Sequence, residues 1–252
     1  MTQRMQPLLV YFGHHKCASQ WMRRIVTHIC KVVGRDPVTV NNWVQFRDSL
    51  DVIRSPGSTF LVCANAEMRQ VPCLTEIDPG FRGFHIVRDP RDIVVSAYFS
   101  HLYSHKPFEG LAERRERLQA APKKEGLLLE LENRQHEFRA MLDWDYDQPN
   151  VLELRMEEAT TAAPAEVPRI VDFLGLGKAD GLTAKRVGQI VAANEFSVLA
   201  GRSPGEEDVQ DHYRKGLPGD WVNHFEAEHV AYFKEHYGKL LIKLGYESDD
   251  NW

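Results

Sequence analysis

The segment GFHIVRDPRDIVVS, residues 83–96, contains the pattern that decides the fold of this chain. Gly83–Val87 is a short apolar run of the kind that forms a buried strand, and the part from Pro90 onward has helical spacing. The segment therefore predicts Arg88 at the carboxyl end of a strand and Ser96 two turns into the next helix. A guanidinium and a hydroxyl in these positions can bind one phosphate from two sides. Arg-Asp-Pro also occurs at ordinary strand ends, so a purely structural role stays open.

Short apolar runs elsewhere predict further strands at residues 8–12, 38–40, 59–64 and 151–154. Helical patterns separate or follow them at 19–33, 43–53, 90–103, 127–144, 167–174, 181–199 and 225–244. This alternation predicts an α/β fold in which a central parallel sheet is flanked by helices, within a single domain over residues 1–252. We expect the polar segment 104–126 to be a mobile insertion on the substrate side rather than part of the core.

The composition argues against several classes of protein. The formal net charge of the 252 residues is -5, whereas general nucleic-acid binding leaves a strongly basic footprint. No apolar run approaches the roughly 20 residues of a membrane span. The cysteines have neither zinc-like spacing nor the density of a disulfide scaffold; they are Cys17, Cys30, Cys63 and Cys73. We therefore expect a cytoplasmic protein with reduced thiols.

The loop GHHKCASQW, residues 13–21, joins the first predicted strand to the first helix. Such a connection gathers backbone N–H groups and the positive end of a helix at one spot. Lys16 adds a positive charge, and Ser19 and Gln20 add donors in the first turn, so the loop has the parts of an anion site. A plain connection with an exposed lysine stays open. The Gly-Lys-Ser/Thr ending of an ATP- or GTP-binding loop is missing, and the two histidines lack a third metal ligand.

A second basic loop reads HYRKGLPGDW, residues 212–221. Arg214 and Lys215 are followed by Gly216, which lets the backbone approach a ligand closely. We expect an anion clamp here, although a solvated turn with incidental charges is the alternative. Asp220 is placed to cap the terminal helix.

These three stretches together resemble the sulfotransferases that use 3′-phosphoadenosine-5′-phosphosulfate, of the cytosolic, bacterial-like type. HKCASQW resembles the 5′-phosphosulfate loop of that family, RDPRDIVVSAY its 3′-phosphate motif, and RKGLPGDWVNHF its C-terminal Arg-Lys-Gly signature. LELRMEE, residues 152–158, resembles a further strand-end segment. The order and spacing agree from about residue 8 to residue 230, which implies the P-loop-like, nucleotide-kinase-like sulfotransferase fold.

The resemblance also implies which residues bind the donor. The 5′-phosphosulfate would be held by Lys16, Ser19 and Gln20 together with the backbone amides of Cys17 and Ala18. The 3′-phosphate would be held by Arg88, Ser96, Arg214, Lys215 and Gly216. Trp21 and Phe196 would stack on the two faces of the adenine, although both also suit a core. Lys16 would stabilise charge on the leaving oxygen, with no metal required.

The implied activity is transfer of a sulfuryl group to a hydroxyl or amine of a small-molecule acceptor, releasing 3′-phosphoadenosine-5′-phosphate (PAP). The alternatives are an ATP-dependent small-molecule or nucleotide kinase and a non-catalytic nucleotide-binding module. The general base stays open. The family often has a histidine after the third strand, where this chain has Glu67; His101 and His105 are further candidates, and His85 is expected to be a satisfied core histidine. The dimer motif of the animal enzymes is missing from residues 222–231, so the oligomeric state is open too.

Overall fold

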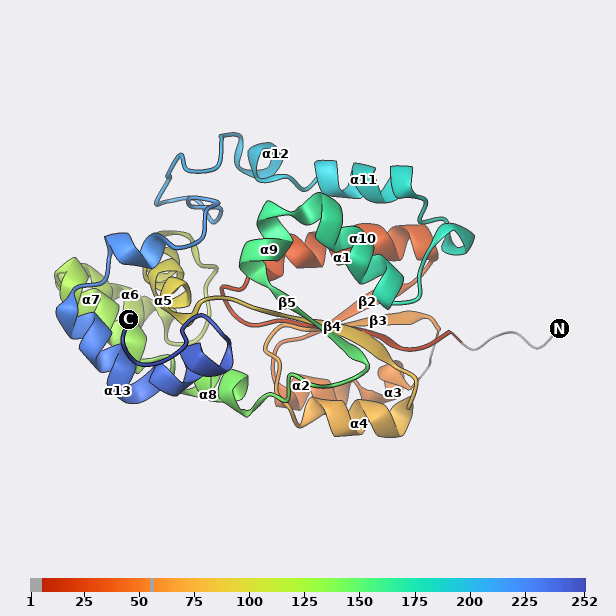
Figure 1. Cartoon of the computed structure of the whole chain (residues 1–252), viewed down its shortest axis with the longest axis horizontal. Helices are drawn as coiled ribbons and strands as arrows, with labels where there is room; N and C mark the ends of the chain where they lie inside the picture. Colours follow the sequence, from red (N-terminus) through yellow and green to blue (C-terminus); the bar gives the residue numbers. More distant parts are fainter. Residues whose placement is uncertain (1–5, 55–56) are drawn as a thin grey trace. The chain divides into compact units, whose positions relative to one another are not determined.

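The computed structural model describes residues 6–54 and 57–252 (Figure 1). Two compact units can be distinguished. The sheet unit comprises the described residues up to Val87 together with Asp143–Glu195, and the helical unit comprises Arg88–Leu142 together with Phe196–Trp252. The chain passes from the sheet unit to the helical unit directly after Val87. The 13–21 loop therefore belongs to the sheet unit, and Arg88 is the first residue of the helical unit.

The sheet unit contains, in its described part, a five-stranded parallel sheet with the order β2-β3-β1-β4-β5. The strands are β1 (Leu9–Phe12), β2 (Asp36–Val40), β3 (Thr59–Cys63), β4 (Arg82–Val87) and β5 (Val151–Arg155). Phe12 at the end of β1 is in register with Cys63 on β3 and with His85 on β4. Every residue of β1 and β3 is buried, which is why their sequences are continuously apolar.

Helices cover both faces of this sheet (Figure 1). One face carries α2 (Trp43–Asp48), α3 (Leu50–Ile53) and α4 (Gln70–Ile77), and the other carries α1 (Ser19–Val33), α9 (Met156–Thr161), α10 (Ala163–Phe173) and α11 (Ala184–Ala192). A short 3-10 turn, η2 (Lys178–Asp180), precedes α11. The apolar side chains of α1 are buried at helical spacing, and Gly34 ends the helix with a φ of 70° that suits glycine. The sequence therefore fixes both the inner face and the end of α1.

The helical unit is assembled around α5 (Pro90–Phe99), which packs against α7 (Lys123–Glu132), and α7 packs against α13 (Ala227–Lys243). The other elements are the π-helical turn η1 (Ser100–Ser104), α6 (Leu111–Ala120), α8 (Gln135–Asp143, whose last residue belongs to the sheet unit), α12 (Phe196–Ala200) and the 3-10 turn η3 (Asp220–Asn223). Phe138 of α8 packs against Phe233 and Tyr237 of α13. These aromatic contacts give the unit an apolar core of its own.

The predicted α/β class and the predicted strands are confirmed, and the differences concern helices. The predicted helix 90–103 ends in the π-helical turn, 43–53 divides into α2 and α3, 127–144 into α7 and α8, and 181–199 into α11 and α12. Helices α4, α6 and α9 were not predicted.

Part of the expected insertion 104–126 contributes to the core of the helical unit. Helix α6 lies within it, and its residues Leu111 and Leu118 are buried. Apart from these two leucines the helix is mostly charged, so it has only a weak apolar stripe that could predict it from sequence. The mobility of this segment and its role toward a substrate stay predictions.

Candidate active site

The loop after β1 carries backbone strain at two residues. Lys16 has a φ of 64° and Ala18 a φ of 53°, and they are the only non-glycine residues with positive φ in the described part of the chain. Residues with a Cβ rarely adopt this backbone conformation, and such strain is concentrated at ligand sites. Alternation between right- and left-handed residues turns successive N–H groups toward one point, which makes an anion-binding nest. The loop geometry therefore supports the predicted anion site.

Hydrogen bonds to the backbone hold this loop in place. The Gly13 amide donates to the Cys63 carbonyl at 2.8 Å, and the Cys17 amide donates to the His14 carbonyl at 3.2 Å. Helix α1 then begins at Ser19, and its N-cap residue Ala18 provides no side-chain cap. The predicted anion site in this loop is thus formed by backbone groups, and Lys16 supplies its charged side chain.

Gln20 lies on the exposed face of α1 and lines an open groove of about 430 Å³. The other lining residues are Arg23, Arg24, Thr27, His28 and Lys31. This lining contains three permanent cations and no carboxylate, so it presents a positive field at the helix that follows the loop.

Trp21 is mostly buried, with 9% of its surface exposed. Its Nε1 donates to the Asn194 carbonyl at 2.8 Å. The Asn194 side chain accepts from Arg24 Nε at 3.3 Å and lies 3.0 Å from His28 Nδ1, so this buried amide joins α1 to the end of α11. The core role that the sequence left open for Trp21 is therefore present, and stacking on adenine stays a proposal.

In the helical unit, Asp92 brings the RDPRD motif and the second basic loop together. Its Oδ2 lies 3.6 Å from Arg88 Nη2. The same carboxylate accepts from the backbone N–H groups of Gly219 at 2.7 Å and Trp221 at 2.9 Å. Ser96 lies on α5, partly exposed, eight residues after Arg88. Two motifs that are more than 120 residues apart in the sequence are thus adjacent.

Asp220 organises the cations of the second basic loop. It accepts from Arg214 Nη2 at 2.6 Å and from Lys215 Nζ. Arg214 also pairs with Glu207. Burial alone would raise the pKa of Asp220, but the hydrogen bonds from Lys215, Asn223 and Arg214 outweigh it and hold that pKa below its usual range. The expectation that Asp220 caps the terminal helix was wrong: it begins η3, and Glu226 is the N-cap of α13.

Gly216 lies directly against the Phe196 ring. Its φ is 70°, and a Cβ at this position would meet Cδ2 of Phe196 at 2.5 Å. The guanidinium of Arg202 lies 5.5 Å from the same ring and donates to the Arg214 carbonyl at 3.1 Å. Phe196 therefore packs against the second basic loop at Gly216, and its role in binding a nucleotide stays a proposal.

The predicted site residues divide between the two units. Lys16, Cys17, Ala18, Ser19, Gln20, Trp21 and Glu67 belong to the sheet unit, and Arg88, Ser96, Phe196, Arg214, Lys215 and Gly216 belong to the helical unit. In the helical unit, Asp92 joins Arg88 to the second basic loop, and Phe196 contacts Gly216 of that loop. In the sheet unit, Glu67 lies before α4 and follows Ala66, whose backbone N–H donates to the Gly13 carbonyl of the 13–21 loop at 2.8 Å. Asp92 and Asp220 contact the predicted binding residues of the helical unit, Asp92 through Arg88 and Asp220 through Arg214 and Lys215. These contacts were not predicted from the sequence.

Glu67 has a structural role at the beginning of α4. Its carboxylate pairs with Arg69 Nη2 at 2.6 Å, and its backbone N–H donates to Gln70 Oε1 at 3.0 Å. The Arg69 guanidinium lies 4.4 Å from the centroid of the Trp43 ring. These contacts hold Glu67 in the turn before α4, and its role as a general base stays a prediction.

A buried chain of polar side chains anchors His14, the second residue of the 13–21 loop. His85 Nε2 lies 2.8 Å from His14 Nε2, and His85 Nδ1 lies 2.7 Å from Glu153 Oε2. Burial lowers the pKa of His85 to about 3 and that of His14 well below its usual range, and burial raises the pKa of Glu153 to about 8. A protonated Glu153 therefore donates to His85, which donates to His14. The prediction that His85 is a satisfied core histidine is confirmed.

A model of the sulfotransferase domain family matches residues 77–245, about two thirds of the sequence. The chain belongs to the sulfotransferase domain family. The match includes the RDPRD motif and the second basic loop of this sulfotransferase domain, and it begins after the 13–21 loop. No curated protein matches the sequence.

Solved structures share the fold of this sulfotransferase domain. The crystal structure of mouse sulfotransferase SULT7A1 complexed with PAP is 18% identical with a TM-score of 0.61, and the match covers 95% of this chain and 84% of the mouse chain. A retinol dehydratase in complex with androsterone and the inactive cofactor PAP is 17% identical with a TM-score of 0.55, over 94% of this chain and 82% of the other. Within the described residues, no helix has both the length and the apolar character needed to span a bilayer.

Proposed function

We propose that this sulfotransferase domain moves a sulfuryl group from 3′-phosphoadenosine-5′-phosphosulfate to a hydroxyl or amine of a small-molecule acceptor. The observation that carries the proposal is the strained loop between β1 and α1, where Lys16 and Ala18 adopt left-handed conformations beside an uncapped helix N-terminus. Backbone held in this way at an energetic cost is typical of a site that binds an anion. A further support is that both similar proteins described above were crystallised with PAP.

The proposed binding residues match the charge of the donor. A phosphosulfate and a 3′-phosphate carry roughly four negative charges near neutral pH. Lys16, Arg88, Arg214 and Lys215 supply four positive charges. Asp92 and Asp220 hold three of these cations in position before the nucleotide binds, so less conformational freedom is lost on binding.

The residues have separate tasks in the proposed reaction. Lys16 and the loop amides bind the sulfuryl-bearing end, and Lys16 stabilises the charge that develops on the leaving oxygen. Arg88, Ser96, Arg214, Lys215 and the Gly216 amide bind the 3′-phosphate. Trp21 and Phe196 position the adenine. The donor supplies the activated sulfuryl group, and the chain supplies orientation and electrostatic stabilisation.

We also propose a cytoplasmic location and an acceptor of small organic type. Cys17, Cys30, Cys63 and Cys73 form no disulfide in the described part of the chain, which fits a reducing compartment. The androsterone held by the retinol dehydratase supports a small organic acceptor for this fold.

Calorimetric titration with PAP, AMP and ATP tests the proposal. We expect PAP to bind at least about tenfold more tightly than AMP, because the 3′-phosphate adds charge-assisted hydrogen bonds of about 1.5–3 kcal/mol. ATP that binds more tightly than PAP would favour a kinase instead. Release of PAP from the donor in the presence of an acceptor alcohol or amine distinguishes an enzyme from a binding module.

A further inference from the structure

The charges of this chain are distributed unevenly along the sequence. Residues 1–35 contain six lysines and arginines and no aspartate or glutamate. Their formal charge is +6, and because the chain total is -5, residues 36–252 carry -11. The 13–21 loop and α1 both lie within this positive segment. A polyanionic ligand is therefore repelled by the charge of most of the chain and attracted by the segment that contains the loop.

Three cations of this segment lie on one side of α1. Arg23, Arg24 and Lys31 line the groove of about 430 Å³ that Gln20 also lines. Their spacing along the helix places them on the same face. Among the described residues that line the groove, none is a carboxylate and none is apolar. The groove therefore suits an anion and offers little to the carbon skeleton of an acceptor.

The hydrogen bonds of the two arginines leave their charges uncompensated. Arg23 Nη2 donates to the Thr39 hydroxyl at 3.5 Å, and Arg24 Nε donates to the side-chain oxygen of Asn194 at 3.3 Å. Both partners are neutral. Burial lowers the pKa of His28 in the same groove, and the charges of neighbouring cations, Arg24 among them, lower it further. The imidazole thus responds to a positive field on this face of α1.

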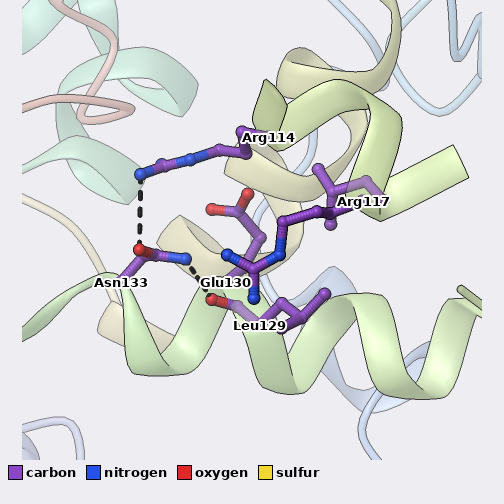
Figure 2. Close-up of a pocket in the computed structure, with 6 residues that line it drawn as sticks. Arg114, Arg117, Leu129, Glu130 and Asn133 are labelled. Atoms are coloured by element: carbon purple, nitrogen blue, oxygen red, sulfur yellow. Dashed lines mark hydrogen bonds between the residues drawn. The ribbon is translucent and has the colours of Figure 1, made fainter. Parts of the chain in front are cut away.

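The pocket between α6 and α7 has the opposite character (Figure 2). Arg114 and Arg117 of α6 lie beside the carboxylate of Glu130 on α7, and Asn133 accepts from Arg114 at 3.4 Å. The volume among these side chains is about 10 Å³, room for about one water molecule. Those cations face a carboxylate and leave no space for a ligand, whereas the groove on α1 has space and no opposing charge.

The two arginines lie close to the 13–21 loop along the helix. At about 1.5 Å per residue, Arg23 and Arg24 are about 4.5 and 6 Å beyond Gln20, and Lys31 is about 16 Å beyond it. Charges in water are screened over about 8 Å at physiological ionic strength. The field of the arginines therefore reaches Gln20, a predicted ligand of the 5′-phosphosulfate, and the field of Lys31 is largely screened there.

We propose that Arg23 and Arg24 form an encounter site that attracts the polyanionic donor before its phosphosulfate end enters the 13–21 loop. The inference rests on the proposed function and adds the route by which the donor arrives. The donor carries roughly four negative charges near neutral pH, and a guanidinium keeps its positive charge throughout the physiological range. Attraction of this kind raises the association rate constant and has little effect on the dissociation rate constant.

Stopped-flow mixing with PAP, followed by tryptophan fluorescence, measures both rate constants. The variants are Arg23→Gln, Arg24→Gln and the double glutamine variant. Lys31→Gln is the matched control, because it removes the same charge from the same helix farther from the loop. A variant with lysine in place of both arginines keeps the charge and loses the planar fork. Each is measured at about 0.15 M salt and at about 1 M salt, where screening acts over about 3 Å.

At the lower salt concentration we expect each single arginine variant to associate with PAP about threefold more slowly. This is the effect of one unit charge on four charges about one screening length away in water. The double glutamine variant should be slower by about tenfold, with the dissociation rate constant within about twofold of the original. Lys31→Gln and the double lysine variant should associate within about twofold of the unmodified rate. At about 1 M salt the differences should vanish.

An unchanged association rate in the double glutamine variant overturns the inference while PAP binding and the proposed function stand. An effect confined to the dissociation rate, or a double lysine variant that behaves like the glutamine variant, would mean direct contact with bound PAP and also overturns it. Calorimetry should give one PAP per chain, and two would indicate a separate nucleotide site instead. If Arg24→Gln does not fold because its bond to Asn194 is lost, Arg23→Gln decides the result. Absence of PAP binding by the unmodified chain contradicts the proposed function itself.

Discussion

Replacing Gly216 by alanine should both strain the second basic loop and displace the Phe196 ring. The φ of Gly216 is 70°, and a left-handed conformation costs a residue with a side chain about 1–2 kcal/mol. The new Cβ would lie 2.5 Å from Phe196 Cδ2, whereas ordinary contacts begin at 3.4 Å, so the ring must move by about 0.9 Å (3.4 − 2.5). Overpacking of this kind adds about 1–3 kcal/mol. We therefore expect Gly216→Ala to lower the free energy of unfolding by about 2–5 kcal/mol.

Gly219→Ala is the matched control in the same loop. Its φ is 79°, but nothing lies within 4 Å of the added Cβ, so only the backbone cost of about 1–2 kcal/mol applies. Urea unfolding gives both stabilities, and calorimetry gives the affinity of each variant for PAP. Gly216→Ala should bind PAP at least about tenfold more weakly than Gly219→Ala if Phe196 and the loop form one nucleotide site. Equal stabilities and equal PAP affinities for the two variants would refute the reasoning.

Three other predictions concern charge. Lys16→Ala should lower kcat by more than about tenfold. Lys31→Ala removes an exposed cation from α1, the helix that follows the loop, and controls for net charge. Unchanged turnover in Lys16→Ala would remove Lys16 from the leaving-group role. Arg88→Ala should weaken PAP by about 10- to 100-fold and AMP much less, so equal losses measured by calorimetry would exclude Arg88 from the 3′-phosphate site. The pKa of Glu153 is raised to about 8 in the folded chain, so near neutral pH this carboxyl is protonated in the folded state and ionised in the unfolded state. The free energy of unfolding should therefore fall as the pH rises toward 8. Between pH 6.5 and 8 the loss is at most about 2 kcal/mol, from 1.5 pH units at 1.36 kcal/mol each, and Glu153→Gln should remove this slope from unfolding curves. An unchanged slope would show that Glu153 is ionised in the folded chain.

Local sequence determined the elements that have a strong pattern and a clear end. The predicted helix 19–33 has the bounds of α1, because its apolar side chains keep one face buried and Gly34 ends it. The helix predicted over 181–199 is interrupted near Asn194. The side-chain amide of Asn194 accepts from Arg24 Nε and donates to the Ile190 carbonyl, and the contact with Arg24 cannot be inferred from the local sequence. Helix α6 was missed because its charged sequence is stabilised by tertiary burial of two leucines.

The binding motifs were predictable from sequence, whereas the residues that organise them were not. A motif is contiguous, so loop 13–21 and the RDPRD segment can be read directly. Asp92, in contrast, acts on Gly219 and Trp221 across a long sequence separation. The chain from His14 through His85 to Glu153 depends on strand register: His85 is paired with Phe12 on β1 and with Glu153 on β5. Such partners become visible only when the order of the strands is known.

The central claim is that Lys16 of the sheet unit and Arg88 and Arg214 of the helical unit bind one nucleotide. A crystal structure of this chain with PAP tests it most directly. We expect the 5′-phosphate to contact Lys16 and the amides of the loop after β1, and the 3′-phosphate to contact Arg88, Ser96 and Arg214. A complex in which PAP contacts only one of these two groups of residues would contradict the account.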